Sequence, residues 1–232
     1  MRKVKILYFI SLIFLALSCE KDDLTQPVEV KFEFSMDSFH MDGVSKAGST
    51  FDIDEGIIII NEIEFDGRRD QGEDYYFTSG FSSPVMIQMH NGVMSQEMSY
   101  DIPQGVYNRI ELNLSLGDTN QYALQLKGRF QRGPMEEVLV EFEYEFQEQI
   151  RIRARNNQGN EQVVLTKNSD LTANVIMDVP YLFQLVNMNM IQNAEMTNNG
   201  GTQILEINNN KNTNIFNLLA TRLDNSMRVV FD

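Results

Sequence analysis

Hydrophobic and polar residues alternate along much of this chain. From Val28 to Phe34 every second residue is apolar, and the residues between them are Glu or Lys. The same period recurs from Ile110 to Leu116 and, over the longest run, from Val138 to Ala154. A period of two places one face of a strand against a core and the other in water. The pattern therefore predicts a protein built mainly of strands, with a bend or bulge where Glu148 breaks the long run.

Two segments depart from simple alternation in an informative way. The run Ile57–Ile60 is continuously apolar and then alternates as far as Phe65, which predicts a central strand buried on both faces at first and on one face later. Asn91-Gly92 is a strong hairpin signal, because both residue types tolerate a positive φ. We expect it to join a strand at Val85–Met89 to one at Val93–Tyr100.

The residue composition changes after Pro180. Met and Asn dominate residues 187–200, where we expect the methionines to pack in the core, and Ile204–Ile207 reads as a short strand. Apolar residues at helical spacing then predict one short C-terminal helix over about 213–224, capped by Asn212 or Thr213. Val229–Phe231 closes the chain as a strand.

These elements predict an all-β fold. Short strands and long connections favour an antiparallel β-sandwich with Greek-key or prealbumin-like topology. We find no repeat and no convincing linker, so residues 28–232 are expected to form one domain, with 180–232 as a C-terminal extension.

Residues 1–18 have the layout of a signal peptide. Three basic residues precede an apolar run of about 12 residues, which is too short for the roughly 20 that span a bilayer. Small residues then lead to Cys19, and this arrangement resembles a bacterial lipobox. The resemblance implies cleavage before Cys19 and a covalent lipid on its thiol and new amino group. The alternatives are an ordinary signal peptide with an incidental cysteine and a transmembrane anchor.

Residues 19–27 read as an acidic tether. Within it, Lys21, Asp22 and Asp23 resemble the surface-export signal of lipoproteins from the Bacteroides–Flavobacterium group. The resemblance implies an outer-membrane protein that faces outward. The simpler interpretation is a charged, solvated tether.

Composition excludes several classes of function. Removal of residues 1–18 leaves 232 − 18 = 214 residues with a net charge of (19 − 3) − 33 = −17. A chain this acidic repels nucleic acid, so nucleic-acid binding is excluded. With Cys19 acylated no thiol remains, which excludes disulfides, cysteine-ligated zinc and a cysteine nucleophile. Tryptophan is absent, which disfavours a tight sugar site based on stacking.

The turn at Pro103-Gln104-Gly105-Val106-Tyr107, followed by the strand to Leu112, resembles an element of bacterial surface lipoproteins. These carry a domain of uncharacterised function with a transthyretin- or immunoglobulin-like sandwich. The segments Leu171–Asp178 and Asn208–Phe231 resemble its final strand and C-terminal extension. The family provides no catalytic residues that could be transferred to this chain.

Candidate binding residues cluster at predicted loop ends. We expect the loops 66–74 and 156–160 to contact a ligand, with Tyr75 and Tyr76 as stacking residues and Arg68 and Arg69 as charged contacts. Asp52, Asp54 and Glu55 resemble part of a calcium loop but lack its later ligands, and Arg68 and Arg69 oppose a cation in the second acidic loop. We therefore predict no metal and no cofactor other than the lipid.

Rows of like charge mark the longest alternation. Glu141, Glu143 and Glu145 share one face, and Arg151, Arg153 and Arg155 follow on the same parity. We expect a solvated face, with cross-strand ion pairs if the chain folds back near Glu148. A carboxylate pair of the glycosidase kind is a weaker alternative.

Together these features predict a non-catalytic, surface-exposed outer-membrane lipoprotein that binds a polysaccharide or a protein partner. The alternative is a fimbrial or structural subunit that assembles by strand addition, with Met227–Phe231 as the donated strand. A hydrolase with an unrecognised site is a third hypothesis.

Overall fold

The computed structural model describes residues 26–43, 48–118, 121–133, 136–167 and 171–232. The predicted signal peptide, Cys19 and the export residues Lys21, Asp22 and Asp23 lie outside these ranges. Within them, no helix is both long enough and apolar enough to cross a membrane.

The described residues form one large mixed sheet, and the all-β prediction is confirmed. Its strands are β1 (Pro27–Met36), β2 (Phe39–Asp42), β3 (Thr50–Arg69), β4 (Tyr75–Gln88), β5 (Val93–Met94), β6 (Ser99–Pro103), β7 (Gly105–Leu116), β8 (Leu124–Gln131), β9 (Glu137–Tyr144), β10 (Glu148–Asn156), β11 (Val163–Leu165), β12 (Leu171–Met177), β13 (Thr197–Asn199), β14 (Thr202–Ile207) and β15 (Met227–Phe231). The helices are α2 (Val179–Leu182), α3 (Met188–Gln192), α4 (Thr213–Ala220) and the 3-10 turn η1 (Leu223–Asn225).

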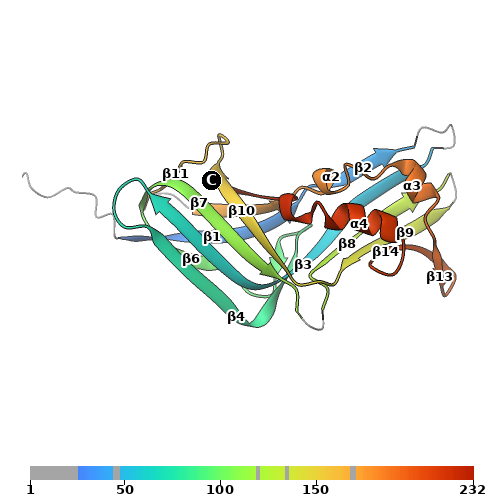
Figure 1. Cartoon of the computed structure of the whole chain (residues 1–232), viewed down its shortest axis with the longest axis horizontal. Coiled ribbons are helices and arrows are strands. Elements are labelled where there is room, and N and C mark those ends of the chain that lie inside the picture. The colour runs from blue at the N-terminus through green and yellow to red at the C-terminus, as the bar shows by residue number, and fades with distance from the viewer. Residues whose placement is uncertain (1–25, 44–47, 119–120, 134–135, 168–170) are drawn as a thin grey trace, which may run out of the picture.

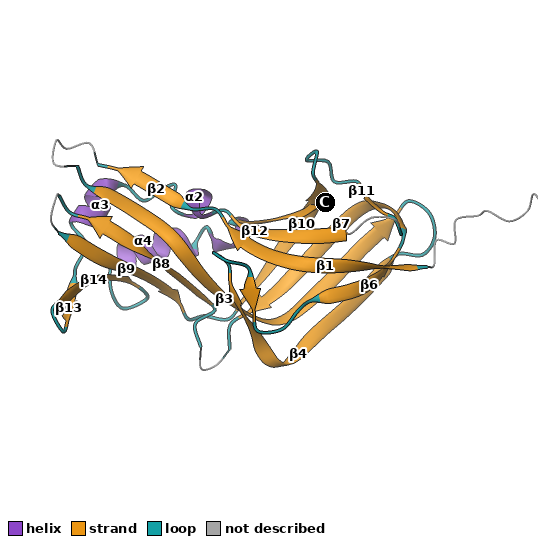
Figure 2. Ribbon diagram, turned by 180° about the vertical axis from the view of Figure 1, so that it is seen from behind, coloured by secondary structure: helices purple, strands orange, loops and turns teal. Residues whose placement is uncertain are grey.

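The strand β3 runs through both halves of the molecule. Its first half pairs with β2 and β8, and its second half pairs with β4 and β7. The first half belongs to what we call the helix-covered lobe, with β8, β9, β14 and β13 (Figure 1). The second half belongs to the curled lobe, in which the sheet continues through β7, β10, β15, β12, β1 and β6 (Figure 2). A single apolar core extends through both lobes.

The apolar run in β3 marks the passage between the lobes. Ile58, Ile59 and Ile60 are all buried, as expected for a strand covered on both faces. The register shifts between Ile60 and Glu62, which is a bulge of the kind that bends and twists a strand. The prediction of a central, doubly covered strand is confirmed here.

The sheet is not purely antiparallel, so that part of the prediction was wrong. β1 pairs with β12, β10 with β15, and β14 with β9 in parallel. Parallel neighbours need long connections, and in each case the chain between the two strands passes through other elements first. Alternation reveals that a strand has one buried face, but it carries no information about the direction of its neighbour.

The break at Glu148 is a crossing between lobes rather than a fold-back. β9 ends at Tyr144 in the helix-covered lobe, and β10 begins at Glu148 in the curled lobe. The two strands do not pair, so the fold-back that cross-strand ion pairs would need is absent between them.

The helix expected over 213–224 is present as α4 followed by η1. α4 buries Ile215, Phe216 and Leu219, and the ring of Phe216 lies over Tyr144 with centroids 6.0 Å apart. Asn212 is the N-cap residue, but its side chain binds backbone groups of Glu195 and Glu206 instead of the helix.

The prediction of a single helix was wrong, because α2 and α3 precede α4. They have only four and five residues, too short for a helical period to stand out. Met188 of α3 is buried in the core, as the core-packing interpretation of this segment predicts.

Among the glycines of the chain, Gly128 of β8 leaves the least room for a side chain. A Cβ atom there would lie 1.8 Å from the carbonyl oxygen of Asp52, opposite a register shift in β3. We expect Gly128→Ala to lower the free energy of unfolding by about 3 kcal/mol or more, because backbone must move on both strands. Gly80→Ala in β4 is the control, since its Cβ would meet only the Glu62 carboxylate at 3.5 Å, and it should change stability by less than about 0.5 kcal/mol. Urea denaturation of both variants measures the difference, and equal midpoints would contradict this account.

Candidate functional site

Two of the four predicted ligand contacts, Tyr75 and Arg69, form contacts within the chain. Tyr75 is half-buried: its hydroxyl donates to the carbonyl oxygen of Asp101 at 3.1 Å, and its ring packs 6.2 Å from Phe65. The expectation that Tyr75 is an exposed stacking residue was therefore wrong. Burial alternates along β4 from Tyr75 onward, and the odd-numbered aromatic residues are on the side that faces the core.

Arg69 helps to build a corner at the end of β3. Its guanidinium donates to the carbonyl oxygen of Gln104 at 2.7 Å and lies 5.8 Å from the ring centre of Tyr107. The Tyr107 hydroxyl donates to the carbonyl oxygen of Pro103 at 2.7 Å, four residues upstream. Gly67 leaves room for this ring, because a Cβ there would lie 2.6 Å from it. The Pro-x-Gly-x-Tyr segment thus closes on itself, and Arg69 is engaged in the corner rather than presented to a ligand.

Tyr76 and Arg68 are exposed, as predicted. Tyr76 is 60% exposed, and its hydroxyl lies 2.7 Å from that of Thr78. Arg68 is exposed on the outer face of β3.

The two predicted binding loops lie at one end of the curled lobe. β3 and β10 each run antiparallel to β7, so both strands end on the same side. Asn108 connects their loops, because it donates to Asp70 at 3.2 Å and accepts from Gln162 at 3.3 Å.

The calcium candidates lie on β3, where protein groups already occupy two of them. Asp52 binds a ring nitrogen of His40 at 2.5 Å, and Asp54 forms an ion pair with Arg129 at 3.1 Å. The Asp52 hydrogen bond raises the pKa of His40, and Asp42 adds to this effect. Glu55 follows a register shift in β3. Within the described ranges, no group of three His, Cys, Asp or Glu side chains could hold a metal ion.

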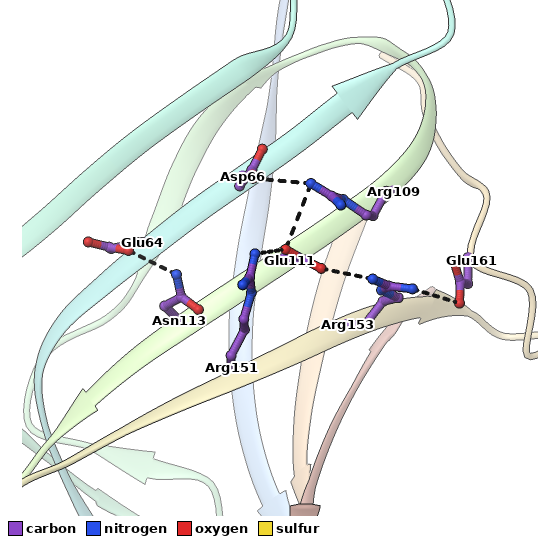
Figure 3. Close-up of polar contacts among 8 residues, drawn as sticks. All are labelled: Glu64, Asp66, Arg109, Glu111, Asn113, Arg151, Arg153 and Glu161. Carbon is purple, nitrogen blue, oxygen red and sulfur yellow. Dashed lines mark hydrogen bonds and ion pairs between the residues drawn. The ribbon is translucent and has the colours of Figure 1, made fainter. Parts of the chain in front are cut away.

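The outer face of the curled lobe carries a network of ion pairs, which we call the arginine network (Figure 3). At its centre the Glu111 side chain is only 6% exposed and accepts from Arg151 and, at 3.1 Å, from Arg153. Arg109 bridges Glu111 and Asp66 at 3.8 and 3.5 Å, and Arg153 also reaches Glu161 at 3.5 Å. The strand register brings the centre of the network together, because Glu111 of β7 lies opposite Asp66 of β3 on one side and Arg153 of β10 on the other.

The charge of Glu111 depends on these arginines. Burial by itself would raise its pKa, but the hydrogen bonds from Arg153 and Arg151 and the charge of Arg109 outweigh burial. The net effect is a pKa below the usual 4.5, so the carboxylate stays ionised.

The charges within the arginine network balance one another. Asp66, Glu111 and Glu161 balance Arg109, Arg151 and Arg153, so its formal charge is zero. We interpret it as a brace across three strands rather than a ligand site. The alternation of β7 indicated that Glu111 faces outward, but not that three arginines from two strands would cover it.

The curled sheet does not close on itself, and its two free edges face each other. β6 pairs only with β1, and residues 75–80 of β4 pair only with β3 among the described strands. We call the gap between β4 residues 75–80 and β6 residues 99–103 the seam. Only side chains cross it: Tyr75 reaches Asp101, and the rings of Phe77 and Tyr100 are 4.6 Å apart.

A groove of about 320 Å³ opens at one end of the seam. Both sides contribute to its lining, which includes Ser79, Gly80 and Ser82 with Glu97, Ser99 and Tyr100. This groove and the exposed Tyr76 at the outer side of β4 make the seam the candidate site for a partner.

No family model, no curated protein and no solved structure matches this chain.

The corner at Tyr107 gives a first test. Burial raises the pKa of Tyr107 to about 12, so its hydroxyl remains a donor at neutral pH. We expect Tyr107→Phe to lower the free energy of unfolding by about 1–2 kcal/mol, because the Pro103 carbonyl loses its donor. Tyr76→Phe removes an exposed hydroxyl and should cost less than about 0.5 kcal/mol. Denaturant titration compares the two, and an equal loss would contradict a role for the corner.

The arginine network gives a second test, in which pH matters. A carboxylate with a lowered pKa contributes stability above its unfolded pKa and loses it as the pH falls through the folded value. We expect Glu111→Gln to cost about 1–3 kcal/mol at pH 7, a deficit that shrinks as the pH falls below about 4.5. Glu161→Gln, whose side chain is 43% exposed, should cost less than about 0.5 kcal/mol. Denaturation across this pH range measures both, and a deficit for Glu111→Gln that stays constant with pH would refute the network's role.

Proposed function

We propose that this chain is a non-catalytic lipoprotein of the outer membrane, exposed at the cell surface, that binds a polysaccharide or a protein partner. The signal peptide, Cys19 and the Lys21-Asp22-Asp23 segment support the anchoring and the export. Two or three acyl chains on Cys19 hold a protein firmly, whereas a single chain binds only marginally. No cofactor other than this lipid belongs to the proposal.

The observation that carries the binding role is the seam. Among the described strands, residues 75–80 of β4, which include the exposed Tyr76, have a free backbone edge, and the free edge of β6 faces them across a groove. Free edges invite pairing with another chain unless the protein blocks them. In this proposal the curled sheet is a variant of the transthyretin- or immunoglobulin-like sandwich of similar lipoproteins. The three parallel strand pairs are where it departs from their antiparallel topology.

The alternative proposal, a fimbrial or structural subunit, needs a different donor strand from the one expected. β15 lies between β10 and β12, bonded to both. Donating Met227–Phe231 to another copy would split the curled lobe down its middle. The seam supports strand addition to this chain as an acceptor instead.

The lipid anchor can be tested by Cys19→Ser in cells grown with a radioactive fatty acid. We expect the wild-type protein to carry the label and to stay with the membrane, and the variant to lose both, because the acyl chains provide the attachment. Lys21→Ala/Asp22→Ala/Asp23→Ala should keep the label but become resistant to trypsin added to whole cells. A matched triple variant, Leu24→Ala/Thr25→Ala/Gln26→Ala, should remain sensitive. Label on the Cys19→Ser protein would refute the anchor.

The binding role is tested with the mature protein on glycan arrays and by capture of partners from intact cells. Turnover of a substrate by the mature protein would contradict a non-catalytic role.

A further inference from the structure

The free edge of β6 presents backbone groups that point into the seam. Phe32 donates to the carbonyl oxygen of Met98, and Gln104 donates to that of Gln26, so even-numbered residues of this segment face β1. Backbone groups alternate in direction along a strand, which turns those of Ser99 and Asp101 away from β1. The Asp101 carbonyl oxygen confirms this direction, because it accepts from Tyr75 across the seam.

The two edges run in opposite directions. Tyr75 lies against Asp101 of β6. Four residues later in β4, Ser79 forms a hydrogen bond with the side chain of Tyr100, which comes just before Asp101 in β6. Because the Tyr75 contact is made by the end of its side chain, the two backbones stand a side chain apart. Hydrogen-bonded strands lie about 4.8 Å apart, and a strand inserted between two others needs about twice that spacing.

The inner side of the seam is apolar and incompletely covered. Tyr75, Phe77, Phe81 and Tyr100 pack against the core but remain half-buried. An additional strand with apolar residues facing inward would remove these rings from water, which favours its binding at roughly 25 cal/mol for each Å² of apolar surface buried.

The outer side is acidic. Asp101 is exposed on β6, and the neighbouring strands expose Glu29 and Glu33 on β1 and partly expose Glu62 on β3. Glu97 lines the groove, while Lys31 is the one cation on the outer face of β1. The whole chain is acidic as well, with a net charge of −14. Outward side chains of an added strand would therefore be favoured if they were basic.

We propose that the seam binds an extended segment of a partner protein whose residues alternate between apolar and basic. The segment lies between β4 and β6 and pairs with the backbone of Ser99 and Asp101. Its apolar residues cover Phe77 and Tyr100, and its basic residues face Glu29, Glu62 and Asp101. This inference rests on the proposed binding function and names the class of partner.

The test uses the mature protein and a peptide of about seven alternating Val and Lys residues. We expect binding that weakens as the salt concentration rises. Hydrogen exchange of the Ser99 and Asp101 amides should slow when the peptide is added. A Val/Glu peptide of the same length should bind at least about tenfold more weakly.

Two substitutions at one position separate the backbone from the charge. Asp101→Pro removes an N–H that points away from β1, so the hydrogen bonds between β1 and β6 are kept. This substitution should weaken peptide binding at least about tenfold. Asp101→Ala removes the same carboxylate but keeps the N–H, and should bind within about threefold of the wild type. Circular dichroism and melting temperature verify that both variants fold, and the exchange measurement on wild-type protein does not depend on either of them.

Several outcomes would overturn the inference. They are equal binding of the Val/Glu peptide, unchanged binding by folded Asp101→Pro, and exchange rates at Ser99 and Asp101 that the peptide does not alter. A partner captured from cells equally by wild type and Asp101→Pro would refute the seam but leave the proposed function standing. A mature protein that captures no partner and binds no glycan would refute both.

Discussion

The backbone ladder of β3 is the constraint on which the rest of this structure depends. Twenty residues of one strand bond to β2 and β8 in the first half and to β4 and β7 in the second. The lobes therefore share a strand and a core, and neither has a complete sheet without it. The passage between them is covered on both faces, which is why Ile58, Ile59 and Ile60 are all apolar and all buried.

The curled lobe combines a braced wall with an open edge. On the wall, Glu111 draws arginines from its own strand and from β10 around one buried carboxylate, and the corner at Tyr107 fixes the end of β3. Leaving that carboxylate without partners would cost more than the network gains, so such a cluster resists partial rearrangement. The opposite side lacks backbone pairing between β4 and β6. The binding role that we propose uses these two unpaired edges as the place where an extended segment would lie.

Much of the fold was predictable because alternation reports burial directly. The strands at Val28–Phe34 and Ile110–Leu116 and the helix near 213–224 were all readable, as was the exposure of Tyr76. Tyr75 and Arg69 were predicted as ligand contacts, yet they bind Asp101 and Gln104, residues about 30 positions away. A local pattern cannot show a partner that the fold supplies from another strand.

The sequence by itself determined the strand-rich class, because that class depends on short periods of apolar and polar residues. The membrane address proposed from Cys19 and its leader also comes from the sequence alone, and it stays a prediction. Only the tertiary structure decided which strands are neighbours and in which direction. It placed β15 in the centre of a sheet, gave Glu111 its arginines and left β4 and β6 facing each other unpaired. The reason is physical: burial depends on each residue's own polarity, whereas pairing depends on the closure of long loops and on contacts between distant segments.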